Sequence, residues 1–171
     1  MALGDNTKAY ETPNHPFQGE RINEEHGLVS RYGLKNKEEL WRAQSELRGY
    51  RRAARRLLGR TEADVREAEE FVSRLQRLGI LSESETLDGV LSLDVTDVLE
   101  RRLQTVVYRQ GLAHTPQQAR QFVNHGHVVV GDRRVREPSA KVEVSAEDDV
   151  AFDGTSPLAD DLHPERAEEQ S

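Results

Sequence analysis

The stretch from Asp94 to Phe152 constrains the fold most, because its residue pattern reads helix, turn, helix, hairpin and strand in that order. Asp94 is a favourable helix N-cap, and the apolar residues within 95–107 recur at helical spacing along one face. Arg102 and Arg109 are seven residues apart, which is almost two helical turns. A single helix over this segment would therefore carry both arginines on the same flank.

A second helix is predicted to begin at Thr115, because Thr-Pro-Gln-Gln supplies an N-cap, a proline at the first helical position and a glutamine that can reach back. Gly126 suits the position just past its end. Residues 127–130 are mostly β-branched, the pair Gly131-Asp132 indicates a tight turn, and Arg133–Arg136 returns as the hairpin partner. A small apolar core with cations on two helices and a hairpin is typical of a module that binds a nucleic-acid backbone.

The net charge of −7 would oppose RNA binding if it were spread evenly, but the charges are segregated along the chain. Two segments are basic, with a net charge of +6 over residues 41–60 and +4 over residues 98–138. Two are acidic, with −7 over residues 61–97 and −9 over residues 143–171. The 20 arginines, only 4 lysines and many carboxylates favour a protein that works in concentrated salt over an ordinary acidic protein with basic patches.

Residues 37–58 are predicted to form a helix, because apolar residues recur there every three or four positions. The opposite face is a run of arginines, which repel one another unless a polyanion compensates their charge. A solvated charged face is the common alternative, but the single sign of the run favours RNA. The expected contacts from this helix are Arg42, Arg48, Arg51, Arg52, Arg55 and Arg56.

The remaining segments are expected to support this arrangement. Residues 62–79 are predicted to form a helix capped by Thr61, which packs on the preceding helix and does not contact RNA. The first 36 residues show little helical periodicity and are expected to be extended. The acidic segment after Phe152 is expected to be largely solvated, with part of it docked on the protein.

The central stretch resembles the S-four RNA-binding domain, which consists of two helices and a small sheet. The residues that carry this resemblance are Leu99-Glu100-Arg101-Arg102-Leu103, Val107-Tyr108-Arg109, Ala119-Arg120-Gln121, His125-Gly126-His127 and Pro138-Ser139. The resemblance implies an RNA-binding surface. The residues expected to form it in this module are Arg101, Arg102, Arg109, Arg120, Gln121, His125, His127, Arg133 and Arg134.

The N-terminal region resembles the start of the archaeal and eukaryotic ribosomal protein S-four family. The matching residues are Tyr10-Glu11-Thr12-Pro13, His15-Pro16-Phe17, Glu20-Arg21-Ile22, Tyr32-Gly33-Leu34-Lys35-Asn36-Lys37 and Glu39-Leu40-Trp41. Together with the charge pattern, the resemblance implies a small-subunit ribosomal protein of a halophilic archaeon, located in the ribosome in the cytoplasm. It further implies binding to small-subunit ribosomal RNA and to neighbouring ribosomal proteins, a role in nucleating subunit assembly and a contribution to translational accuracy.

No motif indicates catalysis or a cofactor. His125-Gly126-His127 is the strongest metal candidate, but zinc needs more ligands and the sequence has no cysteine to supply them, so no metal site is expected. The carboxylates lie in solvated runs, and no phosphate-cradling glycine motif is present. We therefore expect no enzyme activity, no small-molecule substrate and, without a long apolar run, no membrane contact.

The sequence thus predicts an α+β fold with a helical lobe and an S-four module of two helices and a small antiparallel sheet. The expected divisions are an extended segment over 1–36, the helical lobe over 37–93, the S-four domain over 94–152 and an acidic tail over 153–171. Two alternatives remain open. One is a stand-alone S-four-domain stress protein, which fits the length but not the N-terminal matches, and the other is an accessory subunit of an RNA-modifying enzyme.

Overall fold

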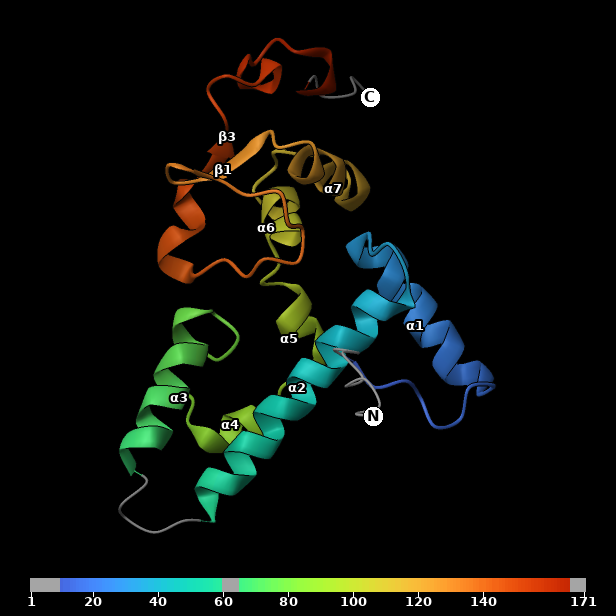
Figure 1. The fold of residues 1–171 in the computed structure, drawn as a ribbon, viewed down its shortest axis with the longest axis vertical. Helices are drawn as coiled ribbons and strands as arrows, with labels where there is room; N and C mark the ends of the chain where they lie inside the picture. Colours follow the sequence, from blue (N-terminus) through green and yellow to red (C-terminus); the bar gives the residue numbers. More distant parts are fainter. Residues whose placement is uncertain (1–9, 60–64, 167–171) are drawn as a thin grey trace, which may run out of the picture.

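The structure, a computed structural model, describes residues 10–59 and 65–166. Figure 1 shows a helical lobe at one end of an elongated molecule and a smaller module of helices and a sheet at the other. The helices of the lobe are α1 (Gly19–Tyr32), α2 (Lys37–Leu58), α3 (Val65–Arg77), α4 (Leu87–Leu91) and α5 (Val95–Leu99). The module contains α6 (Leu103–Arg109), α7 (Pro116–Asn124), β1 (Val128–Val130), β2 (Arg133–Arg134) and β3 (Val150–Phe152). The predicted α+β class is confirmed.

The sheet of the module is antiparallel throughout, with the strand order β2-β1-β3. Gly131, at φ 60°, supplies the left-handed residue of the turn between β1 and β2. The returning strand is shorter than the predicted 133–136, although the Val135 N–H still donates to the Val128 carbonyl at 3.3 Å. The 3₁₀ helix η2 (Val144–Asp149) then leads into β3, and η3 (Pro157–Ala159) and η4 (Pro164–Arg166) follow.

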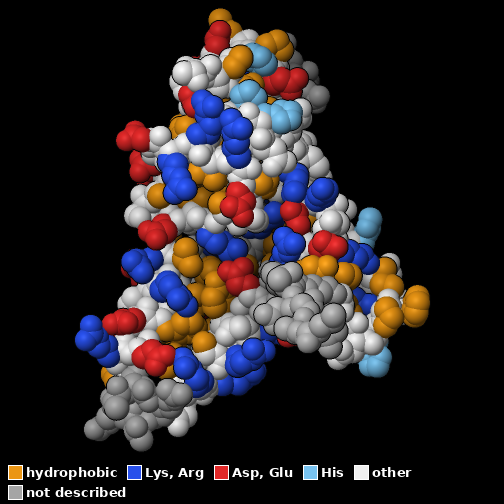
Figure 2. Space-filling view, in the orientation of Figure 1, with side chains coloured by type: hydrophobic (Ala, Val, Ile, Leu, Met, Phe, Trp, Pro, Cys, Tyr) orange, Lys and Arg blue, Asp and Glu red, His pale blue; other side chains and the backbone are white. Residues whose placement is uncertain are grey.

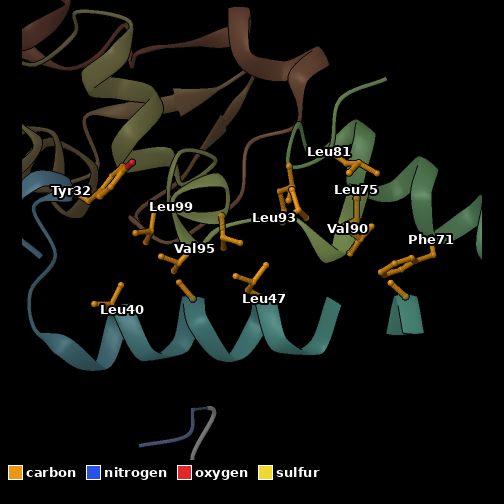
Figure 3. Packing of buried hydrophobic residues seen from close by; sticks show 14 of the residues in the cluster. Tyr32, Leu40, Leu47, Phe71, Leu75, Leu81, Val90, Leu93, Val95 and Leu99 are labelled. Atoms are coloured by element: carbon orange, nitrogen blue, oxygen red, sulfur yellow. The ribbon is translucent and has the colours of Figure 1, made fainter. Parts of the chain in front are cut away.

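Two groups of buried apolar side chains form separate cores. Figure 3 shows the first, which lies along α2 and takes in α3, α4 and α5. The second lies between α6, α7 and the sheet, and its members include Leu103, Val106, Val107, Phe122, Val123 and Val128. The two cores part between Leu99 and Leu103, so the expected domain division at 93/94 cuts through the first core instead of separating the two.

The helix predicted from Asp94 onward is in fact two helices with different axes. Asp94 caps α5 in a full capping box, as its residue type indicated. The chain then leaves helical geometry at Arg102 (φ −70°, ψ 142°), which pairs with Lys141 in an isolated β-bridge. The prediction that Arg102 and Arg109 share one helical flank is therefore wrong, because the pairing of Arg102 with Lys141, 39 residues further along, interrupts the helix.

The N-terminal segment is not extended as expected, since it contains the 14-residue helix α1. The helix packs on α2 partly through a carboxylate, which hid its periodicity from the sequence. Glu25 is only 3% exposed, and its Oε1 accepts hydrogen bonds from Arg21 at 2.8 Å and from the indole N–H of Trp41 at 3.2 Å. A left-handed Gly33 ends the helix.

Other predicted elements agree with the structure. α2 spans the predicted 37–58, with Asn36 as N-cap. α7 begins at Pro116 behind the cap Thr115, although Gln118 reaches back to the His114 N–H, one residue before the cap. α3 packs on α2 as expected, while its predicted cap Thr61 lies outside the described residues. Among the described residues, no helix is both long and apolar enough to cross a membrane.

Part of the chain after β3 docks on the module, as expected, with contacts as far along as Arg166. Leu158 is buried in the second core. The Arg166 guanidinium lies 5.0 Å from the ring centroid of Phe152 and donates to the Leu158 carbonyl at 3.1 Å. Gln118 of α7 donates to Glu165 at 3.1 Å. These contacts make the first part of the tail a layer of the module.

Candidate nucleic-acid interface

One carboxylate of the helical lobe, Glu39, binds two arginines of the module. Both Nη atoms of Arg120 donate to its two oxygens, at 2.8 and 2.9 Å, and Arg102 Nη2 lies 3.5 Å from Oε2. The Lys35 N–H also donates to Oε2, at 2.9 Å. We call Glu39, Arg102 and Arg120 the joint cluster. Because two guanidinium groups share one carboxylate, the cluster buries an excess of positive charge.

Further polar contacts join the lobe and the module. Gln104 Nε2 donates to the Gly33 carbonyl at 2.8 Å and to the Pro116 carbonyl at 2.9 Å, so it joins the end of α1 to the start of α7. Lys141 Nζ lies 3.0 Å from Oε2 of Glu46 in α2. Since hydrogen bonds and ion pairs are directional, these contacts fix the orientation of the module on α2.

The joint cluster changes the role of two arginines expected to bind RNA. Arg102 is 3% exposed, and Arg120 is half-buried against α2, so both act between the two parts of the protein. The sequence pattern that suggested RNA contact could not show which of the cations face inward. In this conformation Arg102 is out of reach of a phosphate.

Two further arginines of the module are paired within the protein. Arg101 donates to the Val142 carbonyl at 2.8 Å and to Glu147 at 3.1 Å, which attaches η2 to the start of α6. Arg109 pairs with Glu100 at 2.9 Å but keeps half of its side chain exposed. Arg101 is therefore largely structural, whereas Arg109 can still meet a ligand.

The hairpin presents its cations at the surface. Arg134 pairs with Asp153, while Arg133 has no ion pair or side-chain hydrogen bond to any residue in the described ranges. Arg136, just beyond β2, is likewise exposed and unpaired there, and its Nε lies over Gly126, where a Cβ would approach it to 2.8 Å. Arg136 was not among the predicted site residues, although it continues the run of hairpin arginines that could have indicated it.

Four of the six predicted arginines of α2 are engaged by the protein itself. Arg42 lies 5.7 Å from the ring centroid of Tyr10, and Arg48 lies 3.6 Å from a Glu11 oxygen. Arg51 and Arg56 are held by the Leu93 carbonyl and by Glu67 of α3, respectively. These contacts restrain the side chains, but Arg42, Arg48 and Arg56 remain exposed.

Arg52 and Arg55 differ from the other four. Both are exposed, and neither makes an ion pair or side-chain hydrogen bond with another residue in 10–59 or 65–166. Along with Arg133 and Arg136 they form a set that we call the free arginines (Arg52, Arg55, Arg133 and Arg136). Among the described residues, no ion pair of these four arginines would have to be broken before they bind a phosphate.

The remaining predicted residues lie around the end of α7. Gln121 and His125 are exposed. His127 is half-buried, and its Nδ1 shares a hydrogen bond of 2.8 Å with the Ser156 hydroxyl. Burial, followed by the neighbouring His125 and Arg134, lowers the pKa of His127, so its ring is neutral near pH 7. Within the described part of the chain, no three His, Asp or Glu side chains are grouped so as to hold a metal ion.

A groove of about 610 Å³ lies beside the hairpin. Leu103, Val130 and Val142 are among its apolar lining residues, and Arg133 and Arg136 are among the charged ones. Figure 2 shows lysine and arginine side chains spread down this face of the molecule, from the hairpin to the lower ends of α2 and α3, with hydrophobic and acidic side chains between them. Cations around a partly apolar hollow suit a chain of nucleotides, which offers both phosphates and base faces.

Glu39, Glu100 and Asp153 are among the described carboxylates whose pKa is lowered by their partners. Burial alone would raise the pKa of Glu39, but hydrogen bonds from Arg120 and Lys35 and the nearby charges outweigh it. For Glu100, burial is likewise outweighed, chiefly by hydrogen bonds from Arg109 and Tyr32. The backbone N–H of Thr155, assisted by Arg134, lowers the pKa of Asp153 to about 2.

Acid should therefore destabilise the protein as the pH falls from about 4.5 toward 2. A carboxylate whose pKa is lower in the folded state stabilises that state at neutral pH, and the contribution is lost as pH falls through the folded-state pKa. The melting temperature, followed against pH in molar KCl, should drop over this range. Asp153→Asn should show a shallower drop than wild type, whereas Glu83→Gln, an exposed control, should follow wild type. The same fall in melting temperature with pH for all three proteins would contradict the prediction.

The chain is similar to known proteins over almost its whole length. Residues 101–148 match the family model of the S4 domain, which is the S-four domain expected from the sequence. Small ribosomal subunit protein uS4 of Natronomonas pharaonis is 68% identical over 99% of this chain and 100% of its own length. The uS4 protein of Halobacterium salinarum is 73% identical over 98% of each chain. That of Methanococcus aeolicus is 48% identical over 95% of this chain and 93% of its own.

Proposed function

The chain belongs to the family of small ribosomal subunit protein uS4, and on that premise we propose that it is a structural constituent of the small ribosomal subunit that binds small-subunit ribosomal RNA. The observation that carries the proposal is the extent of the similarity, which covers 99% of this chain and the whole of one relative. A stand-alone stress protein or an accessory subunit of an RNA-modifying enzyme would be expected to share the S4 domain alone. Similarity over α1, α2 and the tail therefore favours the ribosomal role, with its location in the ribosome in the cytoplasm.

The organisms from which the similar proteins come agree with the charge pattern of this chain. Relatives from Natronomonas, Haloarcula and Halobacterium, all halophilic archaea, are 68–73% identical, whereas the Methanococcus relative is 48% identical. The halophilic archaeal origin expected from the arginine bias and the acidic surface is thereby confirmed. The relatives carry the name of a ribosomal protein, which supports the expectation that the chain has no enzyme activity and takes no small-molecule substrate.

We infer that the cations of the protein have two different roles. The free arginines, with Arg109, would form the RNA-binding face, and the joint cluster would fix the two parts of that face relative to each other. Arginine suits the task because its planar fork can donate two hydrogen bonds to one phosphate. We also place the domain boundary at Arg102, where the two cores part, close to the start of the S4 match at residue 101. Early binding that nucleates subunit assembly, and a contribution to translational accuracy, are the consequences we expect for the particle.

Filter binding to small-subunit ribosomal RNA in molar KCl tests the assignment of the free arginines. Replacing Arg52 and Arg55 together with Ala should weaken binding by about tenfold, because hydrogen bonds to charged groups are worth roughly 1.5–3 kcal/mol before screening by salt. Replacing Arg133 and Arg136 together with Ala should weaken binding by about the same factor. All four replacements together should cost about a hundredfold if the two sites act independently.

Arg66→Ala is the matched control, because this arginine is also exposed on a helix but pairs with Glu70 in an acidic segment. Its RNA affinity should equal that of wild type. Wild-type affinity for the fourfold variant would show that the binding face lies elsewhere. Absence of RNA binding by the wild-type chain itself would contradict the proposed function.

A further inference from the structure

Phe17, just before α1, is the most exposed of the large hydrophobic residues in the described part of the chain, at 93%. Figure 2 shows hydrophobic side chains protruding at the right edge of the molecule, where Figure 1 places the start of α1. A lone exposed leucine or valine needs no explanation, but a fully exposed phenyl ring leaves a large apolar surface in water. Two features of its surroundings indicate that the local structure holds the ring in this exposed position.

The first feature is a packing partner that the ring does not use. Gln18 is the N-cap of α1, so Phe17 is at the preceding position and Ile22 is at the fourth helical position. Apolar residues at these two positions commonly pack together as a hydrophobic staple. At 93% exposure the ring of Phe17 does not form this contact, and Ile22 is half-buried by other parts of the chain.

The second feature is the fixed turn that presents the ring. Arg21 Nη2 donates to the carbonyls of His15 and Pro16, at 2.9 and 3.2 Å, which are the two residues directly before Phe17. Arg21 Nη1 donates to the buried Glu25, which also accepts from the Trp41 indole. The turn is therefore anchored to α2 through a chain of hydrogen bonds. Holding the turn in place before binding lowers the ordering cost that an interface would otherwise pay.

The charge around the ring decides which kind of partner fits. The exposed side chains that follow on α1 include Glu20 and Glu24, whereas the nearby cation Arg21 is already paired with Glu25. Phosphates would meet carboxylates here, in contrast to the surface of the free arginines. A protein surface with an apolar socket and a lysine or arginine rim is complementary to both the ring and its acidic surroundings.

We propose that Phe17 is an anchor that inserts into an apolar socket, bordered by basic side chains, on a neighbouring protein of the small ribosomal subunit. The inference rests on the proposed ribosomal function and names a contact for it. Arg21 and Glu25 then act as positioning residues, because they hold the turn that presents the ring.

Photocrosslinking in the assembled particle tests the anchor. A photoreactive phenylalanine analogue is placed at position 17 of the full chain, the chain is expressed in a halophilic archaeal host, and small subunits are isolated and irradiated. The exposed ring position can accept the analogue in the free protein without disturbing its core. We expect one predominant adduct with another ribosomal protein. An adduct mainly with RNA, an adduct with a second copy of the chain, or no adduct would overturn the inference.

Three variants test the anchor without the analogue. In subunits that carry Phe17→Ala, occupancy by the crosslinked neighbour at limiting concentration should fall by about tenfold, as is common when an anchoring aromatic is truncated. Phe17→Leu should keep most of the occupancy. Leu162→Ala, which truncates a similarly exposed residue of the tail, should leave it unchanged. Equal occupancy for Phe17→Ala and wild type, or an equal loss with Leu162→Ala, would overturn the anchor.

The failure of this inference is distinguishable from failure of the proposed function. If the wild-type chain does not sediment with small subunits, the ribosomal role itself is wrong. If the chain sediments with them and binds ribosomal RNA, but the variants and the crosslink give the negative results above, only the assignment of Phe17 is wrong.

Discussion

Replacing Glu39 with glutamine should lower the free energy of unfolding by about 3 kcal/mol, which is at the lower end for removing one partner of a buried ion pair. The amide that results is neutral, so Arg102 and Arg120 are left beside each other without an anion. Arg102 cannot escape into water, since it is 3% exposed. The measurement is chemical denaturation in molar KCl, with Glu24→Gln, an exposed carboxylate of α1, as the control that should unfold like wild type.

A double-mutant cycle distinguishes the joint cluster from a general loss of charge. Adding Arg120→Gln to Glu39→Gln should cost much less than Arg120→Gln costs in wild type, because the second change removes the charge that the first left unpaired. The single Glu39 variant should also bind ribosomal RNA less well, since the two basic parts would lose their fixed orientation. Strict additivity of the two substitutions would show that Glu39 and Arg120 do not act as a pair.

Gly33→Ala should be at least as damaging, with a loss of about 3 kcal/mol or more once the cost of a left-handed non-glycine residue is added to the clash. Gly33 has φ 60° and lies where α1 ends against the start of α7. A Cβ there would be 2.8 Å from Pro116 Cβ and 2.9 Å from Gln104 Nε2. Because backbone and proline atoms of Pro116 cannot rotate away, the lobe and the module would have to separate.

Gly27→Ala is the matched control for this substitution. Gly27 lies within α1, and a Cβ at that position would meet nothing within 4 Å. Alanine should therefore stabilise the helix by up to about 1 kcal/mol. Thermal unfolding of the two variants beside wild type measures both effects. Similar melting temperatures for Gly33→Ala and wild type would mean that the approach of α1 to α7 is looser than described.

The elements with strong local signals were predictable from the sequence. α2 has a long apolar stripe and an asparagine cap, and α7 has a threonine cap followed by proline, so their beginnings could be placed. The break at Arg102 could not be foreseen, because its cause is the bridge to Lys141 and not a local residue. α1 was missed because one of its buried contacts is a carboxylate, which periodicity analysis counts as polar.

The candidate site shows the same limit at the level of side chains. The run of arginines on α2 correctly indicated a basic surface, but sequence alone could not separate Arg55, which is unpaired within the described ranges, from Arg56, which is paired with Glu67. Glu39 looked like an ordinary acid in the first turn of a helix. Its role depends on Arg120, which is 81 residues away. Pairing over such separations is set by tertiary packing and leaves no local pattern.

The contact between Trp41 and Glu25 has a consequence for spectroscopy. The sequence contains a single tryptophan, and the indole lies between α1 and α2, with the ring of Tyr10 at 6.1 Å. Intrinsic fluorescence excited at the indole band therefore originates in the N-terminal part of the protein, while the module contributes none of it. The isolated chain thus contains its own optical reporter, through which docking of α1 on α2 can be timed during folding without an added dye.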